Sequence, residues 1–293
     1  MKRLLFLFFS VFFLPTLAYP HPGGLDSSGG HFDSITHQYH CHRDICTTIP
    51  PDTTNHIPKN TRPTLGPSRY GPSTSKAMMK IFKGHNKTFY CGCSFNPDKT
   101  IHFEGCYEPI NRWPNRKNIE QEHVVPASFF GNYRACWKKP DECKLPNGKF
   151  KKNRKCCGDI DLEFRKAEAD LHNFKPTIGQ LNAWRSNKPY GVISGNDGIG
   201  GCDFEIDDDL GLAEPRDSIK GDIARVFLYM VDAWDMPLND TQRNMYFEWS
   251  NADPVTDAER IINRKVCEAQ GNSNNFVEPL KFNSETMKCE QVN

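Results

Sequence analysis

Apolar residues recur every three or four positions in several stretches of the chain, and this spacing predicts helices. The clearest stretch is 217–234, where one face carries Ile219, Ile223, Val226, Phe227, Met230, Val231 and Trp234. Weaker patterns predict helices at 161–173 and 257–269, and residues 77–82 are expected to begin another. Pro176 is expected to close the helix at 161–173, because a proline disfavours helical backbone before it.

Alternating apolar and polar residues predict only a few strands. Residues 88–93 and 100–103 alternate in this way and are separated by a turn-like stretch, which indicates a hairpin. Val124 and Val125 are β-branched and favour a strand that Pro126 would end. With few strands and many helices, the expected fold class is α+β with helices dominating.

The first 18 residues have the pattern of a secretory signal peptide. Two basic residues precede an apolar run over residues 4–14, and Ala18 supplies a small residue where cleavage is expected. The run is too short to span a membrane comfortably, and no later segment is as apolar. We therefore expect a secreted or periplasmic monomer with no membrane segment after cleavage.

Twelve cysteines follow the predicted signal peptide, and their even number permits complete pairing. Disulfides are favoured over tetrahedral zinc, because export leads to an oxidising compartment and no Cys-x-x-Cys pair is present. The sequence does not give the connectivity. The local pairs that we expect are Cys93–Cys106, Cys136–Cys143 and Cys267–Cys289, with Cys46 as a candidate partner for Cys41.

Residues 19–46 form a small histidine-rich unit that contains Gly30-His31 and Tyr39-His40-Cys41-His42. This unit resembles the YHCH modules of exported bacterial proteins, with Gly30 in the place of their usual first cysteine. It predicts either metal binding or a disulfide-clipped appendage. Residues 47–76 are rich in Pro, Thr and Ser and predict an extended linker, so the main domain is expected at 77–293.

The net charge is close to zero, which excludes strong attraction of the whole molecule to nucleic acid. Loss of Lys2 and Arg3 with the signal peptide would change 37 basic and 36 acidic residues to 35 and 36. A local basic patch exists at 134–155, where nine basic residues are opposed only by Asp141 and Glu142. This patch is either a solvated loop or a phosphate-contact surface.

The adjacent residues Glu122 and His123 and the later Asn173 are the candidate site. A carboxylate and an amide supply hard oxygen ligands that suit Mg²⁺, with Ca²⁺ or Mn²⁺ as alternatives, while leaving positions for water and phosphate. A neutral histidine beside them can take a proton from water. Glu122 and Asn173 are therefore predicted metal ligands and His123 the general base, in the strand-then-helix layout of a ββα-metal finger. A capping role for the lone Asn173 is the alternative.

Several runs of the chain resemble the endonuclease I family of bacterial periplasmic and secreted nucleases. The matching runs include Glu122-His-Val-Val-Pro-Ala127, Cys136-Trp137, Glu168-Ala-Asp-Leu-His-Asn173, Asn182-Ala-Trp-Arg-Ser-Asn187 and Gln270-Gly-Asn-Ser-Asn-Asn-Phe-Val277. The resemblance implies a disulfide-stabilised ββα-metal (His-Me finger) nuclease that cleaves DNA, and often RNA, with Mg²⁺ and little sequence preference. It also implies His123 as base and Glu122 and Asn173 as metal ligands.

One departure concerns the scissile phosphate. Relatives carry an arginine after the Cys-Trp pair, whereas the run from Cys136 to Cys143 here has none, so Lys138, Lys139 or Arg154 is expected to substitute. Arg185 could contact phosphate or pair with a carboxylate. The predicted function is a secreted, metal-dependent endonuclease. The alternative is an exported metal- or DNA-binding protein without catalysis.

Overall fold

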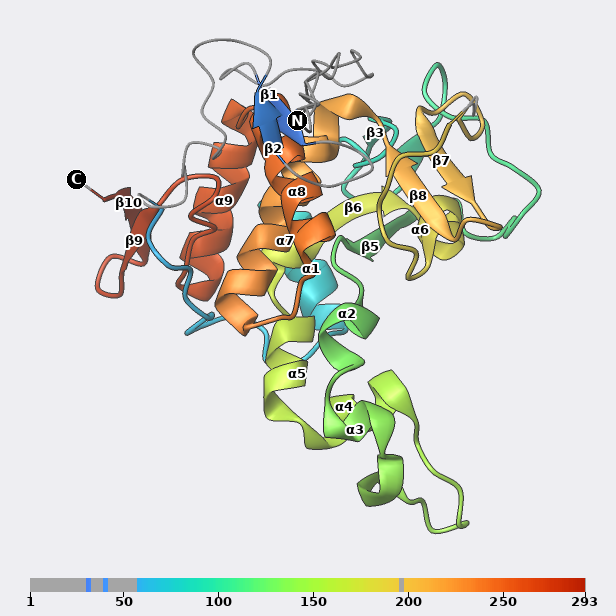
Figure 1. Cartoon of the computed structure of the whole chain (residues 1–293), viewed down its shortest axis with the longest axis vertical. Coiled ribbons are helices and arrows are strands. Elements are labelled where there is room, and N and C mark those ends of the chain that lie inside the picture. Colours follow the sequence, from blue (N-terminus) through green and yellow to red (C-terminus); the bar gives the residue numbers. More distant parts are fainter. Residues whose placement is uncertain (1–29, 33–38, 42–56, 195–197, 293) are drawn as a thin grey trace, which may run out of the picture. The chain divides into compact units, whose positions relative to one another are not determined.

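The computed structural model describes residues 30–32, 39–41, 57–194 and 198–292 (Figure 1). The chain divides into two compact units, residues 1–51 and 52–293. In the first unit, β1 (Gly30–Phe32) pairs antiparallel with β2 (Tyr39–Cys41). The predicted signal peptide, the rest of the histidine-rich module and the partner of Cys41 lie outside the described residues.

The second unit is a mixed α+β domain rich in helices, as predicted. Its α-helices are α1 (Pro72–Ile81), α2 (Ala127–Gly131), α3 (Ala135–Lys138), α4 (Asn153–Ile160), α5 (Leu162–Glu168), α6 (Gly179–Arg185), α7 (Lys220–Trp234), α8 (Asp240–Ala252) and α9 (Asp257–Gln270). Its 3-10 helices are η1 (Pro140–Cys143), η2 (Leu171–Asn173) and η3 (Asp217–Ile219). Its strands form antiparallel pairs: β3 (Ser94–Phe95) with β4 (Ile101–His102), β5 (Ile119–His123) with β6 (Phe174–Ile178), β7 (Phe204–Asp207) with β8 (Leu212–Pro215), and β9 (Leu280–Asn283) with β10 (Lys288–Gln291).

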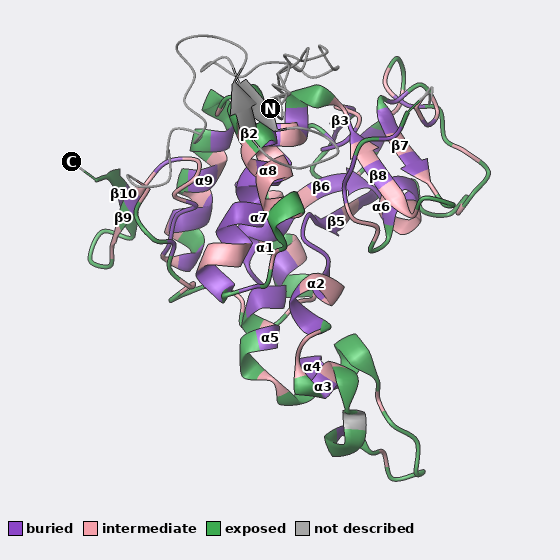
Figure 2. Ribbon diagram, viewed as in Figure 1, coloured by how far each residue is buried: buried purple, intermediate pink, exposed green. Residues whose placement is uncertain are grey.

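Helix α7 is the centre of the hydrophobic core, and Figure 2 shows it buried along most of its length. It packs on α8, where the Phe227 ring stacks on Tyr246 with centroids 4.2 Å apart. Phe129 and Tyr190 meet the same Phe227 ring edge-on. These contacts join α2, α8 and the segment after α6 to one helix. No helix in the described part of the chain is long and apolar enough to span a bilayer.

The predicted helices at 217–234 and 257–269 are confirmed as η3 with α7 and as α9. The predicted hairpin is confirmed in part: β4 lies within the expected strand at 100–103, but residues 88–93 contain a turn and the first strand is the two-residue β3. The helix expected at 161–173 is wrong at its end, because α5 stops at Glu168 and Asn173 closes a 3-10 turn. The periodicity continues through that turn and hides the break.

Strand β6 was not predicted, because it contains Pro176. A proline lacks the N–H that a strand interior needs, but a strand with one neighbour can tolerate it. Among the strands that the structure describes, β6 pairs with β5 alone, and Pro176 lies opposite Gln121. Helix α6 follows β6 directly, so β5, β6 and α6 form a ββα unit.

Residues 136–157 form a basic finger, comprising α3, η1, a loop and the start of α4, that projects from the rest of the unit in Figure 1. Two disulfides, Cys136–Cys157 and Cys143–Cys156, close it. The predicted pair Cys136–Cys143 is therefore wrong, because α4 returns beside α3 and η1 and brings two adjacent cysteines to them. The predicted pairs Cys93–Cys106 and Cys267–Cys289 are confirmed, and Cys91–Cys202 is added.

The predicted linker at 47–76 overlaps the start of α1. Residues 58–65 are hydrogen-bonded to the rest of the second unit, and α1 begins at Pro72.

The disulfide Cys143–Cys156 is expected to limit local opening of the finger, because it closes a short loop in which few side chains are buried. Replacing both cysteines by alanine should raise the rate of tryptic cleavage within the finger by on the order of tenfold or more. The matched control replaces Cys267 and Cys289, which should leave that rate unchanged. Equal rates in the wild type and the first variant would contradict the prediction.

Candidate active site

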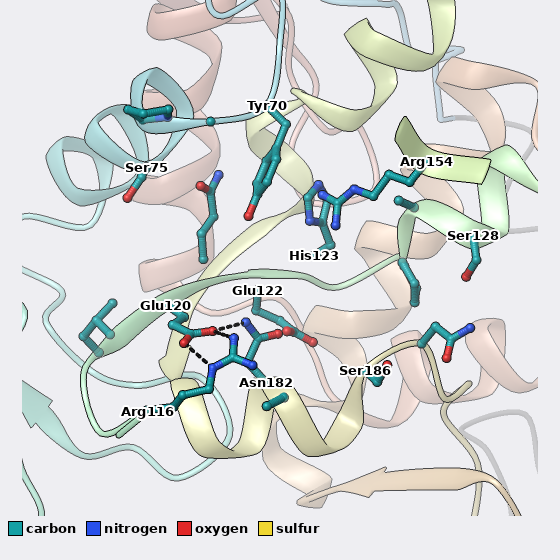
Figure 3. Close-up of a pocket in the computed structure, with 18 of the residues that line it drawn as sticks. Tyr70, Ser75, Arg116, Glu120, Glu122, His123, Ser128, Arg154, Asn182 and Ser186 are labelled. Carbon is teal, nitrogen blue, oxygen red and sulfur yellow. Dashed lines mark hydrogen bonds and ion pairs between the residues drawn. The ribbon is translucent and has the colours of Figure 1, made fainter. Parts of the chain in front are cut away.

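A pocket of about 700 Å³ runs along β5, and all five residues of that strand line it. Successive side chains of a strand point to opposite faces, so Glu120 and Glu122 share one face and His123 takes the other. Figure 3 shows this arrangement, with His123 on one side of the strand and Glu120 and Glu122 on the other. The pocket is nevertheless lined from both faces of the strand, by the imidazole of His123 and by the carboxylates of Glu120 and Glu122.

His123 is held as a neutral imidazole. Its Nε2 lies 2.9 Å from the backbone oxygen of Glu168, and since a carbonyl only accepts, Nε2 carries the proton. The other ring nitrogen, Nδ1, then has its lone pair free. Burial first, and the nearby Arg154 second, lower the pKa of His123 to about 3. The rings of Tyr70 and Phe174 pack against the imidazole, with centroids 4.8 and 4.7 Å from the imidazole centroid.

Arg154 reaches the same pocket from α4, at the base of the basic finger. Its Nε donates to the Glu168 carboxylate at 2.5 Å, and its guanidinium lies over the Tyr70 ring, 4.7 Å from the centroid. Its side chain remains 44% exposed. Glu168 thus orients two groups, His123 through its backbone oxygen and Arg154 through its carboxylate.

Glu122 forms a buried ion pair with Arg185, and both side chains are 1% exposed. The Oε1 atom of Glu122 accepts from Arg185 at 2.9 Å and from the Tyr90 hydroxyl at 2.6 Å. Burial raises the pKa of Glu122, and Arg185 and Tyr90 oppose that rise. Arg185 therefore takes the second of its two expected roles, pairing with a carboxylate.

Asn173 is fully buried, and both ends of its amide bind the backbone of Val125. The Oδ1 atom accepts from the Val125 N–H at 2.7 Å, and Nδ2 donates to the Val125 oxygen at 2.9 Å. Asn173 is not among the residues that line the described pocket. Its position fastens β5 to the start of β6, and the metal role predicted for it gains no support from this geometry.

Asn182, on α6, lines the pocket together with Glu122 and His123. Its Nδ2 donates a hydrogen bond to Glu120 at 2.8 Å (Figure 3). This bond orients the amide and leaves Oδ1 as an oxygen that can coordinate a metal ion. Helix α6 can approach this closely because residue 179 is glycine, where a Cβ would lie 2.6 Å from a Glu120 oxygen. Asn182 lies in one of the runs that resemble the family, but no role was predicted for it from the sequence. What marks Asn182 as a candidate metal ligand is its place on the helix that directly follows β6, and β6 was not predicted from the sequence.

Lys138 and Lys139 lie exposed at the end of α3 and are not among the described residues lining the pocket. Of the three substitutes expected for the loop arginine, Arg154 is the one that the structure places beside His123.

The family model described as Endonuclease I matches residues 74–280. The chain belongs to the endonuclease I family. A protein named Endonuclease-1 from Buchnera aphidicola subsp. Acyrthosiphon pisum (strain APS) is 35% identical over 204 residues, covering 68% of this chain and 76% of that protein. A periplasmic deoxyribonuclease from Aeromonas hydrophila is 33% identical over 207 residues, covering 69% and 82%.

A third relative is an extracellular ribonuclease from Bacillus subtilis (strain 168), 32% identical over 133 residues that cover 37% of this chain and 43% of that protein. The predicted family is thus confirmed, and this member of the endonuclease I family is a nuclease. The predicted secreted or periplasmic location is also confirmed, since relatives are named periplasmic and extracellular and five disulfides are typical of an oxidising compartment.

Replacing Asn173 by alanine should lower the free energy of unfolding by about 2 to 4 kcal/mol, because it leaves the buried N–H and oxygen of Val125 without partners. Urea unfolding measures the change. The exposed Asn132 offers a matched control, and Asn132→Ala should change stability by less than about 0.5 kcal/mol. A similarly small change for Asn173→Ala would show that the clasp contributes little.

Acid should destabilise the protein through His123. Its folded-state pKa of about 3 lies below the ordinary value of 6.5, so between these values only the unfolded chain binds the proton. The stability contributed by neutral His123 is complete above pH 6.5 and declines as the pH falls toward 3. In chelator, His123→Gln should lessen the loss of unfolding free energy between pH 7 and 4.5 by about 2 to 3 kcal/mol. Parallel pH curves for the two proteins would contradict this expectation.

Proposed function

We propose that this protein is a secreted, metal-dependent endonuclease that hydrolyses phosphodiester bonds of DNA, and also of RNA, as a monomer with little sequence preference. The observation that carries the proposal is the set of groups along β5. A neutral His123 with its Nδ1 free lies in one pocket with two oxygen donors and the guanidinium of Arg154. Relatives named deoxyribonuclease and ribonuclease support both substrate classes.

The residues present fit Mg²⁺, with Ca²⁺ or Mn²⁺ as alternatives. Among the described residues, no group of three or more His, Cys, Asp or Glu side chains could hold a metal by itself. Mg²⁺ commonly binds through one or two protein oxygens, with water and phosphate completing its shell. Glu122 and Asn182 would supply those oxygens, so we assign the second ligand to Asn182 in place of Asn173. A bound Mg²⁺ would supply charge neutralisation at the phosphate and the leaving oxygen.

His123 acts as the general base in this proposal. Its Nδ1 accepts the proton of the attacking water, while the Glu168 oxygen keeps the proton on Nε2 and stabilises the imidazolium that forms. Arg154 binds a non-bridging oxygen of the scissile phosphate through its fork of N–H groups. Lys138 and Lys139 contact phosphates further along the strand. Arg185 pairs with Glu122, which favours the charged carboxylate against the effect of burial, and does not contact the substrate.

The first test is cleavage of supercoiled plasmid DNA with metal add-back. Purified protein should nick the plasmid in Mg²⁺ and stop in chelator, and His123→Ala should lower turnover about 10²- to 10⁴-fold while DNA binding persists. His102→Ala is the matched control, because His102 is an exposed histidine on β4. Full cleavage by His123→Ala would refute the assigned base. Binding without cleavage by the wild type would favour the non-catalytic alternative.

The second test separates Asn182 from Asn173 as the metal ligand. Asn182→Ala should weaken Mg²⁺ binding, followed by calorimetry without DNA, at least tenfold, with stability within about 0.5 kcal/mol of wild type. Asn132→Ala again serves as the control. Unchanged Mg²⁺ affinity in Asn182→Ala would remove Asn182 from the site.

A further inference from the structure

Residues 58–71, which we name the N-terminal strap, precede the residues matched by the family model, 74–280. Residues 58–65 of the strap are fastened to the core by hydrogen bonds. The Thr64 and Leu65 N–H groups both donate to the Gln270 oxygen at 3.0 Å. Further bonds join Asn60 to Asp232, Arg62 to the Ala233 oxygen, and Asn272 to the Thr61 oxygen. The strap is thus a fixed part of the second unit.

The far end of the strap enters the candidate active site. Tyr70 and Gly71 both line the pocket, and Figure 3 shows the Tyr70 ring beside His123 with its hydroxyl directed toward β5. The following helix is tied to that strand, because the Thr74 hydroxyl lies 3.2 Å from Gln121 Oε1 and also accepts from the Gly71 N–H. Tyr70 therefore lies between the hydrogen-bonded residues 58–65 and the start of α1, which is tied to β5.

The Tyr70 ring contacts His123, the proposed general base, and Arg154, the proposed phosphate ligand. Its centroid is 4.8 Å from that of His123, and the Arg154 guanidinium lies 4.7 Å from it. Arg154 is otherwise fixed only by Glu168 among the described residues, and its side chain is 44% exposed. An exposed arginine with one carboxylate partner can rotate away from the pocket. An aromatic face against the guanidinium limits that rotation.

We propose that Tyr70 is a positioning residue that holds the Arg154 guanidinium and the His123 imidazole in a fixed relative orientation. The strap thereby supplies the wall of the active site beside His123, which the family-matched residues 74–280 do not provide. The inference rests on the proposed function. It assigns the effect to the Tyr70 ring, which makes both contacts, rather than to the hydroxyl. Tyr70 acts through Arg154 and His123.

The test compares Tyr70→Phe, Tyr70→Ala, Arg154→Ala and the double variant Tyr70→Ala/Arg154→Ala in the full chain, with a fluorogenic DNA substrate and Mg²⁺. Tyr70→Phe keeps the ring and should retain activity within about twofold of wild type, whereas Tyr70→Ala should lose about tenfold in kcat/KM. Because Tyr70 acts largely through Arg154, the double variant should be no more than about threefold below Arg154→Ala alone.

A matched control is Tyr133→Ala, which removes a similar tyrosine–arginine contact, with Arg134 at 5.7 Å, outside the pocket lining. It should leave kcat/KM unchanged. Thermal midpoints within a few degrees of wild type establish that each variant folds. Equal losses in Tyr70→Phe and Tyr70→Ala would overturn the positioning role and assign the hydroxyl to the substrate. Fully multiplicative losses in the double variant, or wild-type activity of Tyr70→Ala, would also overturn it. Cleavage by the wild type in the same assay keeps the proposed function separate from these outcomes.

Discussion

The buried ion pair between Arg185 and Glu122 is the constraint on which the site depends. A carboxylate with 1% exposure keeps its charge only if a partner compensates for lost hydration. Arg185 does this while its remaining N–H groups bind the oxygens of His123, Val124 and Lys188. One guanidinium therefore fixes both the Glu122 carboxylate and the backbone that directs His123. Because Arg185 already neutralises much of the Glu122 charge, we expect modest affinity for a free metal ion and stronger binding when a phosphate adds its own charge.

The segment 168–173 joins this site to the core. Each of its polar side chains is buried and binds a different part of the domain: Glu168 binds Arg154, Asp170 binds Tyr229, Trp234 and Gln270, His172 binds the Asn272 oxygen, and Asn173 binds Val125. A regular helix through these residues would direct them along one cylinder. The break after α5 lets them diverge toward α7, α9 and β5, so hydrogen bonds link the pocket to the centre of the fold.

The sequence predicts the parts of this molecule that local periodicity controls. Helices α7 and α9 follow their apolar spacing, and β5 follows from its β-branched neighbours. Strand β6 could not be predicted, because Pro176 disfavours a strand unless only one edge is paired, and pairing is a tertiary fact. Because β6 was not predicted, the asparagine expected to bind the metal from a helix was taken to be Asn173. In the structure, the helix of the ββα unit is α6, and the asparagine that it carries is Asn182. The cross-linking of the finger was hidden for the same reason, since Cys156 and Cys157 find partners only once α4 turns back.

The loop from Cys136 to Cys143 has no arginine, and the nearest guanidinium to follow it along the finger is that of Arg154. The finger carries the chain out from Trp137 and back to Arg154, and two disulfides hold its outgoing and returning halves together. Both residues line the pocket, so the return helix delivers a guanidinium where the outgoing loop supplies only lysines. A lysine could contribute a point charge there, but only a guanidinium offers a planar fork that can bind Glu168 and present further N–H groups at once. The geometry therefore favours Arg154 over Lys138 or Lys139 for the phosphate, because binding Glu168 directs its guanidinium toward His123.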